Sequence, residues 1–511
     1  MNDRIRRQLR TFQARIARRL ERENEKRGDD GRPVLRGCGA FYEIADRVRA
    51  VAAGGVALVH RMVQALKLDA EIDGRVDVLK LHQPYHESDH VLNIAYNLLA
   101  GGECLEHLEL LRNDENYLDM LGARRIPDPT TAGDFCRRFD SGELIDALQN
   151  AINESRLRVW RTQTDQFFEH ALIDADGSIV EASDCTENAD FSHKGTFGFH
   201  PLLVTLANTQ EVLFIENRPG SRPSHEGAAA RLDAAVALVR RAGFRGVTLR
   251  GDTDFSQTNY LDGWDENGVS FVFGYAAYAN VVESADSLPD AAWQLLERGE
   301  RYQIRTAPRA RPENVRDRVV TEREYHNIHL VHEHVSEFEY QPGKCRKPYR
   351  MVVVRKLLTH EKGQELLFPE TRYFFYITNR RDVSAREIVR LANTRCDQER
   401  VIGQLKSGVK SLCSPLDNLH SNWAYMVMAT LAWNLAKWLA LLLPERGRWR
   451  ERHAAEKHDV LRMNFQTFVS TFMLVPVQIV RTARRLVLRV LAWNRWQHVF
   501  FRSLDAVRAL A

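Results

Sequence analysis

A tight connection between two apolar segments, residues 201–208 and 211–218, restricts the fold of this chain more than any other feature. Both segments are rich in Val, Leu, Ile and Phe, and only two or three turn-like residues separate them. So short a connection can join antiparallel strands, but it cannot hold the crossover that consecutive parallel strands need. The sequence therefore predicts a β-hairpin at this point.

The segments around this hairpin complete an order of strands and helices. Strand patterns occur at residues 171–180, 246–255 and 269–277, and a helical pattern occurs at 224–243. We predict that this helix is capped by Ser224 and closed by Gly243. The order strand, strand, strand, helix, strand, helix, strand is that of a ribonuclease-H-like core, whose first three strands are antiparallel. We expect an α/β ribonuclease-H-like core, which is a mixed sheet flanked by helices.

The remaining sequence divides around this core. A chain of 511 residues is too long for one typical domain. Residues 276–370 show β-rich alternation, which indicates an inserted antiparallel β-rich domain, and a strand at 372–379 returns to the core. The expected units are a helical N-terminal DNA-binding region at 1–165, the core at 166–275 and 371–415, the insertion domain at 276–370, and a helical C-terminal region at 416–511.

The charge and apolar patterns limit the partners of the chain. Residues 1–32 carry eleven Arg or Lys against six Asp or Glu and show an apolar helical face, which suits contact with nucleic acid, an anionic membrane or the chain's own domain. The most apolar run, residues 426–444, contains Asn434 and Lys437, so we predict a buried helix and no membrane span. The seven cysteines lack metal-ligand spacing, which indicates free thiols in a reducing cytoplasm. Histidines also give no metal-site spacing at 193, 200, 225, 326, 329, 332 and 334.

Acidic residues stand at the ends of two predicted strands. Asp174 and Asp176 lie two positions apart and face one side of a strand, next to Gly177, and Asp252 and Asp254 repeat the pattern. Carboxylates crowded together resist joint ionisation unless a cation holds them. Together with one carboxylate from a helix they would form an all-oxygen site suited to Mg²⁺.

The helical carboxylate is Glu399. We expect one continuous helix from an N-cap at Ser384, on which Arg395, Glu399 and Lys406 form a single charged stripe. Two metal ions at three such carboxylates could activate a water or a 3′-hydroxyl for attack on a phosphodiester, and the stripe's basic residues would bind the phosphates of a DNA strand.

A phosphatase is the competing interpretation. Residues 174–178, "DADGS", are similar to the nucleophile motif of haloacid-dehalogenase-type phosphatases, and residues 251–255, "GDTDF", match their later acidic motif imperfectly. That fold places a helix between the nucleophile strand and the next parallel strand, whereas here two strands meet across a tight turn. The hairpin therefore disfavours the phosphatase.

From about residue 100 to its end, the chain resembles DDE transposases of bacterial insertion sequences, in the cut-and-paste group with a Tyr-x2-Arg-x3-Glu-x6-Lys signature. Arg395, Glu399 and Lys406 match this spacing, with Ala392 at the tyrosine position. The family also has a β-rich insertion between its second aspartate and its glutamate, and 147 positions separate Asp252 from Glu399.

Two further family motifs place the aspartates. The first, D-G-T/S, falls on residues 176–178 and favours Asp176 over Asp174. The second, D-x-G-F/Y, falls on residues 252–255, with Asp254 in place of the usual glycine. The resemblance thus implies that Asp176, Asp252 and Glu399 are catalytic and bind metal, with Asp174 and Asp254 as alternates.

The resemblance implies an enzyme that binds terminal inverted repeats, hydrolyses DNA phosphodiesters with two Mg²⁺ ions, which Mn²⁺ can replace, and transfers the freed strand to target DNA. Arg395 and Lys406 would bind DNA. A homodimer would hold the two ends of the mobile DNA element together, and the protein would lie in the cytoplasm, associated with the nucleoid. The other open interpretation is a transposase-derived DNA-binding protein without catalysis.

Overall fold

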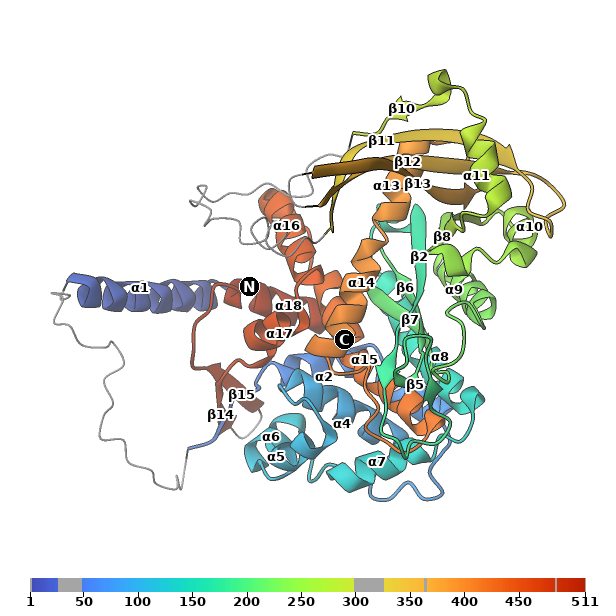
Figure 1. The fold of residues 1–511 in the computed structure, drawn as a ribbon. Helices are drawn as coiled ribbons and strands as arrows, with labels where there is room; N and C mark the ends of the chain where they lie inside the picture. Colours follow the sequence, from blue (N-terminus) through green and yellow to red (C-terminus); the bar gives the residue numbers. More distant parts are fainter. Residues whose placement is uncertain (1, 26–47, 298–325, 363–364, 483–484, 511) are drawn as a thin grey trace.

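A nine-stranded mixed sheet forms the centre of the computed structural model, which describes residues 2–25, 48–297, 326–362, 365–482 and 485–510 (Figure 1). The strand order is β10-β11-β12-β13-β9-β8-β2-β6-β7. Helices cover this sheet and extend to one side of it as a helical body (Figure 1).

One half of the sheet has the topology that the sequence predicts. The central strand β2 pairs antiparallel with β6, which pairs antiparallel with β7, and on its other side β2, β8 and β9 run parallel. The bounds of these strands are β2 (His170–Gly177), β6 (Leu202–Leu206), β7 (Glu211–Glu216), β8 (Gly246–Gly251) and β9 (Ser270–Tyr275). The predicted hairpin is therefore confirmed, and the order β7-β6-β2-β8-β9 is consistent with a ribonuclease-H-like core.

The other half of the sheet is wholly antiparallel. It consists of β10 (Gln294–Leu295), β11 (His326–Tyr340), β12 (Tyr349–Lys362) and β13 (Glu365–Thr378). We expected residues 276–370 to form an inserted domain and a strand at 372–379 to return to the core. The end of β13 does return, because residues 375–378 pair with β9, and through β13 the other strands of this half continue the core sheet. The physical reason is that β9 would otherwise present an unpaired edge, and β13 satisfies its backbone groups. A small separate sheet contains β3 (Val180–Glu181), β5 (Phe197–Phe199) and β4 (Asp190–Phe191).

Helix α9 (Ala228–Ala242) packs on β2 and its neighbours and connects β7 to β8. It ends at Gly243, as predicted, in a left-handed conformation with φ 102°. Its predicted cap, Ser224, is wrong: the helix begins only after Gly227. Arg218 explains the difference, because its guanidinium binds the carbonyl of Ser224 at 3.1 Å and holds this segment as a turn.

The N-terminal part of the described chain is mainly helical. Its helices are α1 (Asp3–Glu25), α2 (Val56–Ala65), α3 (Leu68–Arg75), α4 (Glu87–Leu99), α5 (Leu108–Arg112), α6 (Glu115–Leu121), α7 (Pro129–Arg137) and α8 (Gly142–Trp160). Helix α1 stands out from the body, and touches it at α18 (Gln497–Arg508) (Figure 1).

The apolar run forms α15 (Leu419–Leu441), which is buried along almost its whole length. Asn434 bonds both backbone groups of Val212 at 3.0 Å, and Lys437 donates to the carbonyl of Leu461 at 2.6 Å. Burial lowers the pKa of Lys437 well below its usual value, so this amine sits in the core with a satisfied donor. The prediction of a buried helix is confirmed, and no described helix has the length and hydropathy to span a bilayer.

We expected the C-terminal region to be helical throughout, but it also contains two strands. Its other helices are α16 (Arg450–Leu461), α17 (Phe465–Phe468) and α18. Between them, β14 (Val477–Thr482) and β15 (Arg485–Val490) form a hairpin, and β14 pairs with β1 (Ala50–Val51) from the N-terminal region. The β-branched residues of β14, with Val477 and Ile479 buried on one face, favour a strand at this place.

Candidate active site

Asp176 and Asp252 lie at the same edge of the sheet. Asp176 is near the end of β2, Asp252 follows β8, and these strands are parallel, with Asp174 opposite Arg250. Continuing this register by two residues puts Asp176 level with Asp252. The two carboxyl groups interact electrostatically: the negative charge of Asp252 helps to raise the pKa of Asp176.

Glu399 reaches this edge from α14 (Cys396–Gly403), which runs beside β2 (Figure 1). Its side chain is exposed, and its charge adds to the burial that raises the pKa of Asp252. Within the part of the chain that the structure describes, the three carboxylates do not form a cluster with all ligand atoms within 4.8 Å of one another. They are electrostatically coupled, and the charges of Asp176 and Asp252 both act on Arg395.

Arg395 binds Asp176 directly, with Nη1 3.1 Å from Oδ2. Burial disfavours the charge of Arg395, but Asp176, Asp252 and Asp174 outweigh this effect and raise its pKa. Burial raises the pKa of Asp176 to about 6, and Arg395 only partly opposes the rise. The surroundings of Asp176 therefore disfavour its ionised form, although Arg395 binds it.

Asp174 has a different role from Asp176. It is fully buried, and both of its oxygens accept from Arg250, at 2.6 Å and 2.8 Å. Arg250 also donates to the Leu391 carbonyl at 2.7 Å and to Thr394 Oγ1 at 2.6 Å. This buried pair thus joins β2 and β8 to the segment that precedes Arg395, and its carboxylate oxygens are already used.

Gln398 fixes α14 on the sheet. It is buried, and its Nε2 donates to the carbonyls of Asp174 and Leu203, at 3.2 Å and 3.3 Å. Since successive helical residues differ by about 100° in direction, the next residue, Glu399, turns away from this anchor to the exposed side. Arg250 and Gln398 were not among the residues predicted from the sequence. A charged residue inside an apolar strand was the available signal for Arg250, while nothing in the sequence distinguishes Gln398.

Asp254 lies in the short 3-10 helix Thr253–Phe255, which Asp252 caps by accepting from the Asp254 backbone at 3.0 Å. The side chain of Asp254 is exposed, and its charge also acts on Asp252 and on His200. Asp254 thus lies at the same edge as Asp252, farther into solvent.

Gly177, expected to leave space beside Asp176, leaves room for the ring of His200. A Cβ atom at this position would lie 2.6 Å from Nε2 of His200, too close for any real side chain. His200 is buried, and its Nδ1 lies 2.9 Å from the carbonyl of Arg222. Burial lowers the pKa of His200, so this ring is neutral at physiological pH. It lies next to the sheet edge that carries Asp176, Asp252 and Glu399, which we call the acidic edge.

The predicted continuous helix around Glu399 is interrupted. Ser384 is its N-cap, as predicted, but α13 (Ala385–Asn393) stops before Arg395, and α14 leads into a π-helical turn, Gln404–Gly408. Arg250 accounts for the first break, because it binds the carbonyl and hydroxyl oxygens near the end of α13. Lys406 lies in the π-turn, where its Nζ donates to the Ile179 carbonyl at 2.7 Å. Burial and the nearby Lys194 lower the pKa of Lys406.

The family model described as "Transposase DDE domain group 1" matches residues 46–511. The chain belongs to this DDE transposase family. Among solved structures, it is similar to a piggyBac transposase in a synaptic complex with hairpin DNA. The two sequences are 9% identical, the match covers 83% of this chain and 82% of that chain, and the TM-score is 0.36. No curated protein matches the sequence.

The acidic edge gives one testable prediction about stability in the absence of metal. A rise of the pKa of Asp176 from 3.8 to about 6 corresponds to roughly 3 kcal/mol. Because the folded state holds this proton more tightly than the unfolded state, ionised Asp176 lowers stability as pH rises from about 4 to about 6, and the loss is complete above that range.

We therefore expect Asp176→Asn to stabilise the metal-free transposase by about 1–3 kcal/mol at pH 7.5, since Arg395 keeps Asp252 as a partner. The gain should be smaller at pH 5 and vanish below about pH 4. Denaturant unfolding in a chelator at several pH values measures it. An equal gain at pH 4.5 and pH 7.5 would show that the charge of Asp176 is not its cause.

Proposed function

We propose that the chain is a catalytically active transposase that cleaves the ends of its element and joins them to target DNA, using Asp176, Asp252 and Glu399. The observation that carries this proposal is the convergence of two strand-end aspartates and one helical glutamate at one sheet edge, where each acts on the charge of a neighbour. Asp174 and Asp254 are the less suitable ligands, because Asp174 is held by Arg250 and Asp254 lies farther out.

The donor set fits hard divalent cations. It supplies oxygens from three carboxylates. Burial raises the pKa values of Asp176 and Asp252, and the charge of Asp252 on Asp176 and of Glu399 on Asp252 adds to the rise, so a cation among them would relieve this repulsion. We assign two Mg²⁺ ions, replaceable by Mn²⁺, to these residues. When bound, such ions supply an activated oxygen nucleophile and stabilise the oxygen that leaves phosphorus.

The residues around the acids position the DNA strand. Arg395 already contacts Asp176, and when a cation takes over this neutralising role the guanidinium becomes free to bind a phosphate. Lys406 lies at the exposed border of the edge, beside Lys194, and offers a second phosphate contact. The mostly exposed arginines of α1 provide a further basic surface, which suits DNA at the terminal inverted repeats. Two ends would be joined by a homodimer.

A cleavage assay with DNA that carries the element's own ends tests the proposal. We expect nicking and strand transfer only with Mg²⁺ or Mn²⁺. The competing function, DNA binding without catalysis, predicts end binding with no nicking in either metal, and that result would overturn the proposal.

Replacing Lys406 with alanine is expected to weaken DNA binding to a similar degree on all sequences, because this lysine would contact a phosphate and no base. The slope of log affinity against log salt should become shallower by about 0.9. Filter-binding or fluorescence titrations at several salt concentrations measure this slope. The matched control is Lys347→Ala, which removes an exposed lysine already paired with Asp265. Equal effects of the two substitutions would contradict a phosphate contact at Lys406.

A further inference from the structure

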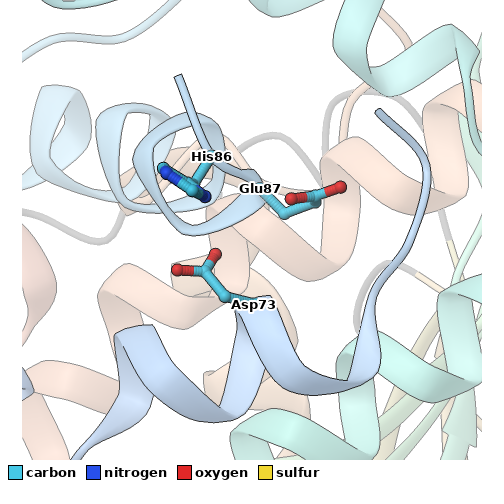
Figure 2. A group of neighbouring side chains, drawn as sticks. All are labelled: Asp73, His86 and Glu87. Carbon is cyan, nitrogen blue, oxygen red and sulfur yellow. The ribbon is translucent and has the colours of Figure 1, made fainter. Parts of the chain in front are cut away.

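A second group of possible metal ligands lies far from the acidic edge in sequence, where residues 76–86 connect α3 to α4. Asp77 and His82 belong to this connection, His86 ends it, and Glu87 is the first residue of α4. Figure 2 shows Glu87 and His86 at the start of α4 and Asp73 on α3 pointing toward them.

Glu87 is the unusual member of this group, because it is 1% exposed and has one oxygen without a hydrogen bond. Its Oε1 accepts from the backbone of Val78 and Leu79, at 3.3 Å and 3.1 Å. Its Oε2 lies 3.2 Å from Nε2 of His82, but this contact lacks hydrogen-bond geometry. A buried carboxylate oxygen without a donor is costly, which points to a missing partner at this place.

The surroundings of this oxygen have the spacing of a metal site. One ligand atom each from Asp77, His82 and Glu87 lies within 4.8 Å of the other two. Two ligand atoms bound to a tetrahedral Zn²⁺ at about 2.0–2.1 Å lie about 3.3 Å apart. The 3.2 Å between His82 Nε2 and Glu87 Oε2 is close to this separation.

The same Glu87 belongs to a second set with Asp73 and His86, whose ligand atoms also lie within 4.8 Å of one another (Figure 2). In that set, however, Asp73 is already occupied: its two oxygens accept from the backbone and the hydroxyl of Ser88, at 2.8 Å and 3.0 Å. Asp77, by contrast, has no hydrogen bond or ion pair with any residue that the structure describes. The set with Asp77 therefore has its ligand atoms available.

We propose that Asp77, His82 and Glu87 bind a divalent transition-metal ion of the Zn²⁺ type. The ring of His86 stacks on that of His82 with centroids 5.4 Å apart, which helps to orient the His82 ring. Imidazole nitrogen together with carboxylate oxygen suits Zn²⁺ and related ions, whereas the all-carboxylate edge suits Mg²⁺. The two sites thus differ in the metal they select.

The ion would have a structural role. It would tie residues 77 and 82 to the first turn of α4, and α4 packs on the buried helix α15. The exposed connection would thereby be fixed on the core of the helical body, and the unpartnered oxygen of Glu87 would gain a ligand bond.

Zn²⁺ binding to the full-length protein, first stripped with a chelator, tests this proposal. We expect calorimetric titration to find a tight Zn²⁺ site, and Co²⁺ in its place to give the visible absorption of a tetrahedral ion. Zn²⁺ should also raise the unfolding temperature, because an ion that binds only the folded state stabilises it.

The variant Asp77→Asn/His82→Gln should weaken Zn²⁺ binding by about tenfold or more and abolish the rise in unfolding temperature. Both side chains are exposed, and Asp77 has no partner among the described residues, so the metal-free fold should be retained, as circular dichroism can verify. His82→Gln alone is the second variant, with the same expected direction. Glu87 is left intact, since it also holds the backbone of residues 78 and 79.

The matched control is His458→Gln/Asp459→Asn, which removes an exposed histidine and aspartate of the same type on α16. A further control, Glu399→Gln, separates this site from the acidic edge and should retain tight Zn²⁺ binding. The proposal is overturned if the stripped protein binds no Zn²⁺ tightly, or if the Asp77/His82 variant binds it as well as the His458/Asp459 control.

Discussion

Replacing Glu399 with alanine is expected to reduce DNA cleavage by about 10³-fold or more, while binding of the element's ends persists. The substitution removes the one helical carboxylate of the acidic edge, and loss of several kcal/mol of transition-state stabilisation at a metal site corresponds to such a factor. Binding should persist because the proposed phosphate contacts, Arg395 and Lys406, lie elsewhere on the same segment. Single-turnover cleavage and an electrophoretic mobility assay measure the two effects separately.

The control for this experiment is Asp397→Ala, which removes another carboxylate from α14. Asp397 pairs with Arg462 at 3.2 Å near the surface, so its loss should leave cleavage within a few-fold of normal. Cleavage at the normal rate by the Glu399 variant would refute the assigned catalytic group. Loss of end binding by the same variant would instead assign Glu399 to DNA recognition.

Replacing Asp174 with alanine should lower the free energy of unfolding by about 3–5 kcal/mol, the second large effect. The substitution leaves the Arg250 guanidinium almost fully buried without its carboxylate partner, and breaking a buried ion pair costs about this much. It also loosens the contact through which Arg250 holds the end of α13. Denaturant unfolding of the metal-free protein measures the loss.

Asp176 is the internal comparison for the Asp174 experiment, because the two aspartates lie two residues apart on one strand but are expected to have opposite effects on stability. Asp174→Ala should destabilise the metal-free protein, while Asp176→Asn should stabilise it at neutral pH. If both substitutions destabilised the protein to a similar extent, the assignment of Asp174 to structure and Asp176 to the site would be wrong.

The sequence was informative wherever local geometry decides the outcome. A connection of two or three residues between apolar segments permits little except a hairpin, so the order of strands in the core could be predicted. The burial of α15 could also be predicted, because Asn434 and Lys437 are too polar for a bilayer. The Ser384 cap followed from the usual chemistry of helix starts.

Other features depend on contacts between distant segments. Asp174 and Asp176 look alike in sequence, since both face one side of β2, and only the position of Arg250 distinguishes the buried acid from the one at the site. The break before Arg395 arises from the same arginine. The β-rich strands were recognised as antiparallel and the strand at 372–379 as part of the core, but that β11 and β12 extend the same sheet through β13 is a long-range choice that alternation of residues does not encode.

The pairing of β1 with β14 has a practical consequence for anyone who wishes to divide this protein. Residues 50–51 complete a sheet with residues 477–478, and the backbone of Gly55 lies so close to Phe472 that a Cβ atom there would be 1.9 Å from its carbonyl oxygen. A recombinant fragment that begins after the first hundred residues would lack β1 and the segment around Gly55. It would therefore expose the unpaired backbone of β14 and the apolar surface around Phe472 to water. Such a fragment should aggregate, whereas co-expression of the two pieces should yield a soluble, reassembled protein.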